Sequence, residues 1–232
     1  MISVHSFQSF FIITGGYVIN SFFLSALHRR KQMQPPSHRP ALAPNHWTFV
    51  SLNLLFAGLF ALATTELSIR GVNRMNYDPV AEYGWYRICW NLLLGILYEN
   101  TVEYYWHRML HSKYLYARFH KIHHYYKSPR PFDDLYIHPL EAFIYYSILY
   151  APPFLFTMHV HAFTIYMIIM GVLGNMDHSG IPFSIPGVYD TEDHAMHHLK
   201  FDMNYGFPFP YLDLLHGTYQ GRFLGIEISR RI

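Results

Sequence analysis

The sequence has few charged side chains and almost no cysteine. Asp, Glu, Lys and Arg make up 14% of its 232 residues, against roughly 25% in an ordinary soluble domain. The formal net charge of +2 gives no electrostatic reason to expect nucleic acid as a partner. The single cysteine, Cys89, excludes an internal disulfide and cysteine-rich zinc or iron–sulfur sites. A metal site in this chain would have to be built from other ligands.

Histidine offers those ligands, with 17 copies in the chain. Eight of them fall into three clusters with the spacings HxxxH, HxxHH and HxxHH. The clusters consist of His107 and His111; His120, His123 and His124; and His194, His197 and His198. On a helix, residues three or four apart share a face, so each cluster can present its rings on one side. Imidazole binds zinc, copper, iron and nickel.

The number of histidines indicates more than one ion. A structural zinc needs only four ligands, usually including cysteine, whereas His138 and His178 raise the possible ligands here to ten. We therefore expect two metal ions with open positions. A ligand histidine normally has its second ring nitrogen held by a carboxylate or a carbonyl. The carboxylates available for this are Glu103, Glu141, Asp177, Asp190, Glu192 and Asp193.

Two apolar runs near the start of the chain have the length of membrane spans. Residues 7–27 and 47–65 carry no Asp, Glu, Lys or Arg. The first run lacks the basic leading region and the small-residue cleavage site of a signal peptide, so we expect a retained anchor. A buried core helix is the alternative.

Two further segments complete the expected membrane part. One begins near Trp85 and continues through Glu99 and Glu103 into the first histidine cluster. The other, residues 142–176, has no Asp, Glu, Lys or Arg and contains Pro152–Pro153. We interpret it as a helical hairpin that turns near residues 158–161, with one long kinked helix as the alternative. The expected fold is all-α, with about four membrane helices and a histidine-rich head.

The distribution of basic residues predicts the orientation. Residues 28–46 and 107–130 contain Lys and Arg but no acid, and short loops of this kind stay on the cytoplasmic side. The N-terminus and the 68–84 loop then belong on the far side, together with His159 and His161 at the hairpin turn. The hairpin returns His138 and His178 to the side of the three clusters.

The ordered motifs resemble the fatty acid hydroxylase and sterol desaturase superfamily from about residue 99 to residue 221. HRxxH and HxxHH, His-Pro-Leu-Glu at 138–141, Asp-His-Ser-Gly at 177–180 and a final HxxHH followed by Asn-Tyr-Gly carry the resemblance. It implies a membrane enzyme, in eukaryotes usually of the endoplasmic reticulum, with two non-haem iron ions on its cytosolic face. Such enzymes oxidise a lipid with O2 and electrons from NAD(P)H, commonly relayed by cytochrome b5. The implied iron ligands are His107, His111, His120, His123, His124, His138, His178, His194, His197 and His198.

The motif spacing looks most like the sterol 4-methyl oxidases, although residues 212–218 lack the Trp-Asp-Arg segment that sterol enzymes of this superfamily usually carry. We expect His216, in that segment, to pack beside the site without binding metal. We divide the chain into membrane anchors at 1–84 and a catalytic domain at 85–232 that includes the 140–177 hairpin. The alternatives are a fatty-acyl or sphingolipid hydroxylase, a sterol desaturase, a metal transporter with ligands in mid-span, or a scaffold without catalysis.

Overall fold

The computed structural model describes residues 1–30 and 41–229, so most of the proline-rich connection after the first helix lies outside the described residues. The helices are α1 (Val4–Arg30), α2 (His46–Ile69), α3 (Val80–Tyr83), α4 (Trp85–Leu110), α5 (Lys113–Leu115), α6 (Pro139–Leu149), α7 (Pro152–Leu155), α8 (Val160–Asp177), α9 (Thr191–Lys200) and α10 (Tyr211–His216). Three short helical turns are η1 (Tyr116–His120), η2 (His123–Tyr125) and η3 (Pro131–Asp133). The expected helical fold is confirmed.

The strands are very short, and each pair joins two loop segments. They are β1 (Met75–Asn76), β2 (Met158–His159), β3 (Ser184–Ile185), β4 (Tyr189–Asp190), β5 (Gly221–Phe223) and β6 (Ile226–Ile228). β1 pairs with β2 in parallel, whereas β3–β4 and β5–β6 are antiparallel pairs. The β1–β2 pair ties the loop after α2 to the turn before α8.

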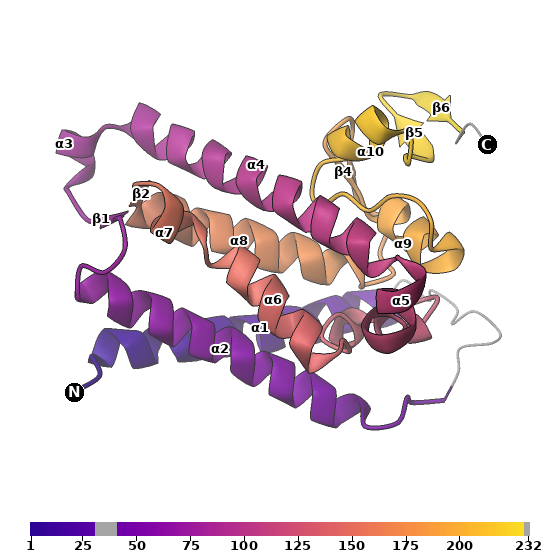
Figure 1. Cartoon of the computed structure of the whole chain (residues 1–232), viewed down its shortest axis with the longest axis horizontal. Helices are drawn as coiled ribbons and strands as arrows, with labels where there is room; N and C mark the ends of the chain where they lie inside the picture. The colour runs from indigo at the N-terminus through magenta and orange to yellow at the C-terminus, as the bar shows by residue number, and fades with distance from the viewer. Residues whose placement is uncertain (31–40, 230–232) are drawn as a thin grey trace.

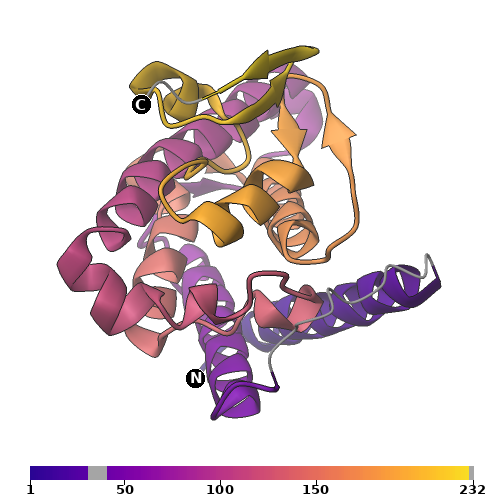
Figure 2. The same ribbon diagram turned by 90° about the vertical axis from the view of Figure 1, so that its right-hand side faces the viewer.

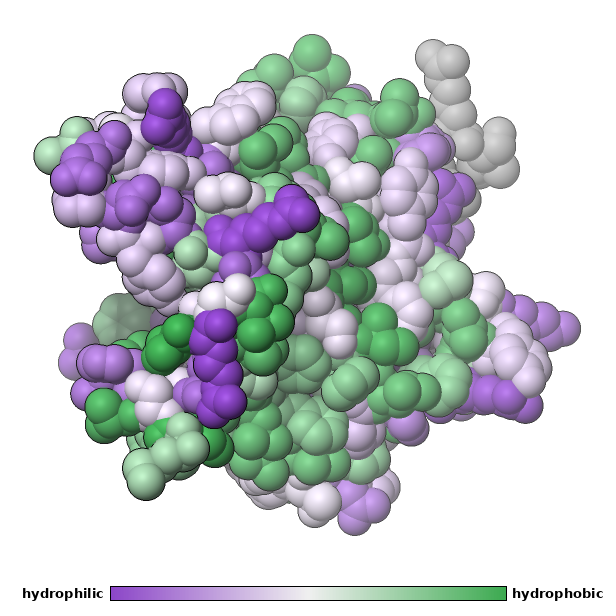
Figure 3. All heavy atoms as spheres, turned by 60° about the vertical axis from the view of Figure 1, so that its left-hand side comes forward, coloured by the Kyte–Doolittle hydropathy of each residue, from purple (hydrophilic) through white to green (hydrophobic). Residues whose placement is uncertain are grey.

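Among the described residues, three helices are long and apolar enough to cross a membrane: α1, α2 and α8. Only 11%, 33% and 28% of their most apolar windows are buried inside the protein, which leaves apolar side chains facing outward. Figure 3 shows hydrophobic residues over much of the middle of one face, with hydrophilic residues gathered toward its edges. Such a belt suits a bilayer. The two expected N-terminal spans are confirmed as α1 and α2.

The remaining two expected segments differ from ordinary spans, one in its charged residues and the other in its length. α4 is a continuous helix of 26 residues, but it carries charges along its length and is not among the three apolar helices. The hairpin exists, and the long kinked helix is wrong, because α6 ends before Pro152 and the chain reverses through β2. α6 has 11 residues and therefore rises only about 16 Å, roughly half of a hydrocarbon core.

The helices place the loops at two opposite ends of the molecule (Figure 1). The N-terminus, α3, β1 and β2 lie at one end, and α5, α9 and the start of α2 lie at the other. His159 and His161 are therefore far from the histidine clusters, as the expected topology requires. Figure 2 views the molecule from the cluster end and shows α9 near the centre of that end.

Both N-terminal helices pack against the segment that leads into the site. Tyr17 of α1 donates a hydrogen bond from its hydroxyl to the carbonyl oxygen of Pro131, 3.0 Å away. Asn53 of α2 is fully buried, and its amide donates to the carbonyl oxygens of Leu135 and Ile137, each at 2.9 Å. The loop from 131 to 138 is thus held from the membrane side.

The contact between α1 and α2 predicts the effect of a small substitution. A Cβ atom at Gly58 would lie 2.5 Å from the Phe10 ring and 2.8 Å from Thr14. We expect Gly58→Ala to lower the free energy of unfolding by about 1–3 kcal/mol, because the Phe10 and Thr14 side chains, or the helix that carries them, must shift. Chemical denaturation in mixed detergent micelles would measure this.

Gly16→Ala is the matched control, since nothing lies within 4 Å of the new methyl group. Equal stability of the two variants would show that α1 and α2 do not pack as described.

Candidate metal centre

The three clusters are positioned by different backbone geometries. His107 lies in the last turn of α4 and His111 caps that helix. His120 ends a five-residue π-helical turn, and His123 and His124 begin a 3-10 turn. The third cluster lies on α9, whose first turn is capped by the side chain of Asp190. His178 follows α8 directly as its C-cap residue.

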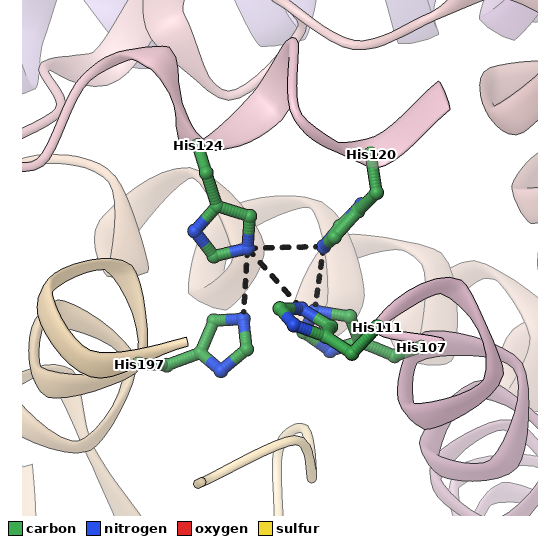
Figure 4. A group of neighbouring side chains, drawn as sticks. All are labelled: His107, His111, His120, His124 and His197. Carbon is green, nitrogen blue, oxygen red and sulfur yellow. Dashed lines mark hydrogen bonds between the residues drawn. The ribbon is translucent and has the colours of Figure 1, made fainter. Parts of the chain in front are cut away.

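Nine histidines converge in two groups. In each group, one nitrogen from every ring lies within 4.8 Å of the others. The first group contains His107, His111, His120, His124 and His197, and the second contains His123, His178, His194 and His198. Figure 4 shows the five rings of the first group turned toward one another from α4, the 116–125 segment and α9. Seven of the nine residues are buried.

Hydrogen bonds on the far side of the rings determine which atoms face inward in the first group. The Nδ1 atoms of His107 and His197 lie 3.0 and 2.6 Å from the carbonyl oxygens of Tyr205 and Met203. The Nδ1 atom of His120 lies 2.7 Å from a carboxylate oxygen of Glu141. A neutral imidazole has one N–H group, and these acceptors require it at Nδ1. The inward Nε2 atoms therefore carry lone pairs.

In the second group, acceptors on the outer side also hold the Nδ1 atoms of two rings. The Nδ1 atom of His198 donates to the carbonyl oxygen of Tyr126 at 3.1 Å. The Nδ1 atom of His178 faces the carbonyl oxygen of Gly174 at 3.0 Å and a carboxylate oxygen of Asp134 at 3.3 Å. The Nε2 atoms of His178 and His198 are nevertheless only 3.3 Å apart.

Opposed lone pairs at this separation repel unless a cation lies between them. In the first group the Nε2 atoms of His107 and His120 are 3.2 Å apart, and neither has a proton to share. Two nitrogen ligands about 2.0–2.1 Å from one ion lie roughly 2.9–3.4 Å apart at octahedral or tetrahedral angles. The geometry and the all-nitrogen donor set therefore fit one transition-metal ion in each group.

The residues that orient the rings were only partly foreseen. Of the six expected carboxylates, Glu141 reaches a ring nitrogen. Asp177 instead accepts from the Tyr189 hydroxyl at 2.6 Å, and Asp193 contacts the Tyr219 hydroxyl at 3.3 Å. Asp134 was missed, although it stands in an acidic pair close to His138. The backbone carbonyls leave no signal in a sequence.

Two further histidines lie outside both groups. His138 is the N-cap residue of α6: its Nδ1 accepts a hydrogen bond from the Leu140 backbone at 3.1 Å, and its ring packs against Phe119. His216 stacks on Tyr104, and its Nε2 lies 3.0 Å from the Tyr105 hydroxyl. Neither histidine belongs to the two groups found among the described residues.

Burial favours the neutral form of seven of the nine grouped rings. It lowers the pKa of His123, His197 and His198 well below the usual range, and neighbouring imidazoles lower these pKa values further because two adjacent positive charges repel. A neutral imidazole is the form that binds metal. The protein therefore holds these rings in a metal-binding state at ordinary pH.

A cavity of about 100 Å³ adjoins both groups. Its wall combines five of the grouped histidines with acidic and apolar side chains. The other lining residues are Glu103, Trp106, Leu110, Asp134, Ile137, Glu141, Tyr145, Gly174, Asp177, Tyr205 and Phe207. The cavity gives a small molecule, or one end of a larger one, direct access to the rings.

Comparison with known proteins gives a family-level match over residues 92–218, more than half of the chain, to the family described as fatty acid hydroxylase. Lathosterol oxidase of Rattus norvegicus is 28% identical over 161 residues, which cover 66% of this chain and 53% of the relative. A Delta(7)-sterol 5(6)-desaturase of Schizosaccharomyces pombe is 30% identical over 156 residues, covering 66% and 46%. A very-long-chain aldehyde decarbonylase of Arabidopsis thaliana is 31% identical over 154 residues, covering 58% and 24%.

The aligned region thus spans about half or less of these three curated relatives. No solved structure matches the chain.

The two-group geometry predicts that each ion can be removed separately. His124→Ala removes the nitrogen nearest to three others in the first group, and His178→Ala does so in the second. We expect each variant to fall from about two bound metal ions per chain to about one, because ligand loss lowers affinity in its own group. Elemental analysis of purified protein measures this.

His138→Ala is the control and should retain the wild-type metal content. Loss of an ion in that variant would mean that His138 is a ligand, as the sequence motif implies.

The lowered pKa values also predict how the metal-free protein responds to acid. Above pH 7 neither the folded nor the unfolded rings bind protons. As the pH falls through about 6.5, the unfolded rings become protonated while the folded ones do not. Each such ring lowers the unfolding free energy by about 1.4 kcal/mol per pH unit. Buried acids with raised pKa values, such as Asp193 and Asp213, oppose this trend. The unfolding temperature of chelator-treated wild-type protein should therefore fall relative to that of His123→Ala, which lacks one such ring, as the pH is lowered from 7 to 5. An unchanged difference between the two proteins would contradict the assignment.

Proposed function

The chain belongs to the fatty acid hydroxylase family, and on that basis we propose that it is a membrane-bound oxidoreductase that oxidises a C–H bond of a lipid with O2. One observation carries the proposal: nine histidines bring one ring nitrogen each into two adjacent groups beside a partly apolar cavity. That arrangement offers two metal ions and an adjoining space for a substrate.

Iron is the metal that we propose for both groups, held by the nine grouped histidines. Nitrogen ligands without thiolate suit iron, and groups of five and four nitrogens leave room for further ligands. When bound, the two ions would supply the activation of O2 with electrons from outside the protein. We propose NAD(P)H as the source and cytochrome b5 as the relay, because the basic cluster end suits an acidic partner.

The side chains around the groups have separate tasks. Glu141 and Asp134 fix the orientation of His120 and His178 through their Nδ1 atoms. Trp106, Leu110 and Phe207 give the cavity apolar walls, which suit a lipid and limit the entry of water.

The substrate class that we propose is a sterol. The motif spacing favours 4-methyl oxidation, whereas the names of the relatives, lathosterol oxidase and sterol 5(6)-desaturase, favour removal of ring hydrogens. Both reactions begin by breaking a C–H bond. One relative is named as a very-long-chain aldehyde decarbonylase, and on that basis acyl-chain lipids are the second candidate substrate class.

A metal transporter would place its ligands midway along the membrane helices. Here the groups lie at one end of the bundle (Figure 1), which favours the enzyme over the transporter.

We further propose an orientation and a division of labour. Arg29 and Arg30 end α1, Lys113 begins α5 and Lys121 follows η1, and α5 lies at the cluster end (Figure 1). On this basis we propose that the cluster end faces the cytosol and that the membrane is the endoplasmic reticulum. Residues 1–84 would anchor the chain and 85–232 would carry the chemistry. The hydrogen bonds of Tyr17 and Asn53 to the 131–137 segment make the anchor a support for the site as well.

Turnover tests the proposal directly. Iron-loaded protein in lipid nanodiscs, supplied with NADH, cytochrome b5 and its reductase, should consume O2 and convert an added sterol. His123→Ala should lose at least about 90% of this product, because one of the four nitrogens of the second group is gone. Mass spectrometry after reaction with ¹⁸O2 separates hydroxylation, which labels the lipid, from desaturation, which does not.

Cys89→Ser, an exposed position, serves as the matched control. Undiminished product from His123→Ala, with activity dependent on O2, would overturn the proposed site.

A further inference from the structure

Two glutamates precede the first histidine cluster on the same face of α4. Glu103 and Glu99 stand one and about two helical turns before His107, which corresponds to about 6 and 12 Å along the helix axis. Glu103 lines the cavity, whereas Glu99 is not among its lining residues. The pair therefore extends from the wall of the cavity into the protein.

These carboxyl groups lack hydrogen-bond donors. Glu99 has no exposed surface, and neither of its oxygens has a partner among the described residues. Oε2 of Glu103 has none either. Glu141 shows the same pattern: His120 holds its Oε1, while Oε2 is buried and unpartnered. Buried acceptors without a donor are costly, so they mark places where a ligand donor can bind.

A hydrogen bond between Glu99 and Glu103 can provide a partner for only some of their carboxyl oxygens. Two adjacent buried carboxylates repel, so a single proton between them is favoured. A protonated Glu99 could donate to Glu103, which stands one helical turn further along the same face of α4. This leaves Glu103 and Glu141 as hydrogen-bond acceptors in the cavity wall. Any remaining donor has to come from the occupant of the cavity.

The charges of the wall indicate that this occupant is neutral. Four acids line the cavity: Glu103, Asp134, Glu141 and Asp177. Two metal cations held by the nine histidines would repel a positively charged occupant, and the acids of the wall disfavour a negatively charged one. The occupant needs a hydrogen-bond donor but no positive charge. The apolar residues Trp106, Leu110, Ile137 and Phe207 surround the remainder of the space.

We propose that the cavity binds a lipid through a hydroxyl group, which donates its hydrogen bond to Glu103 with Glu99 as a positioning residue. This inference rests on the proposed function and narrows its substrate class. Because Glu103 lies only about 6 Å along α4 from His107, the carbon that is oxidised lies within a few bonds of the hydroxyl-bearing carbon. The lipid is thus recognised by the polar end that lies next to its reactive carbon.

A binding experiment tests the requirement for a donor. Iron-loaded protein in detergent is titrated with cholesterol and with its 3-methyl ether, which keeps the oxygen but lacks the O–H group. 1-Hexadecanol and its methyl ether form a second pair without the ring system. In at least one pair the alcohol should bind at least about tenfold more tightly than the ether, the effect expected of a hydrogen bond to a charged group. Equal affinities in both pairs, or no binding of either alcohol, would overturn the proposal.

Three substitutions assign the preference to the glutamates. Glu103→Leu should abolish the preference for the alcohol, and Glu103→Gln, which keeps size but not charge, should reduce it several-fold. Glu99→Gln should retain it, since the amide can still donate to Glu103. Glu82→Gln, an exposed position on α3, is the matched control. Unchanged preference in both Glu103 variants would contradict the assignment even if one of them proved unstable, and tighter binding of sphinganine than of either alcohol would contradict a neutral occupant.

Iron content and O2-dependent turnover are measured on the same preparations. Turnover without a preference for the alcohol would leave the proposed function standing and refute this inference. A preference for the alcohol in protein that binds no iron and shows no turnover would support this inference and refute the proposed function.

Discussion

The repulsion between inward-facing imidazole lone pairs is the constraint on which the rest of this structure depends. Nine rings crowd into two groups, and several have their only proton committed to an acceptor on the outer side. Without an ion such an arrangement is unfavourable, so the fold must supply the free energy that holds it in place. Burial, carbonyl acceptors and two carboxylates contribute locally. The helices contribute at longer range, since they determine where those acceptors lie.

This long-range support comes from hydrogen bonds between the membrane helices and the segments that carry the site. α1 and α2 hold the 131–137 segment through Tyr17 and Asn53. That segment carries Asp134, which contacts His178. A buried hydrogen bond from Asn175 of α8 to Ser21 of α1 adds a second tie. The spans therefore form the base on which the second histidine group is built, as well as anchoring the chain in lipid.

The sequence was most informative where chemistry and spacing coincide. The helical character, the two N-terminal spans, the hairpin and the convergence of three clusters with His178 follow from runs of apolar residues and from histidine periodicity. His138 differs because a residue that precedes a proline at a helix start is also a good N-cap, and spacing cannot separate this role from ligation. Asp134 and the carbonyls of Tyr126, Met203 and Tyr205 depend on tertiary contacts, which no local pattern encodes. The short length of α6 could not be predicted, because an uncharged run does not show where a helix ends.

The carbonyl acceptors have a consequence for how such a site tolerates sequence change. His197 is oriented by the backbone of Met203 and His107 by the backbone of Tyr205, so these two hydrogen bonds do not depend on the side chains at those positions, even though the Tyr205 ring also packs against both histidines. What cannot vary freely is the path of the chain between them. Asn204 adopts a left-handed conformation there and bonds through its amide to the carbonyls of Asp193 and Gln220. The identity of one asparagine thus protects the orientation of two histidines that it never touches.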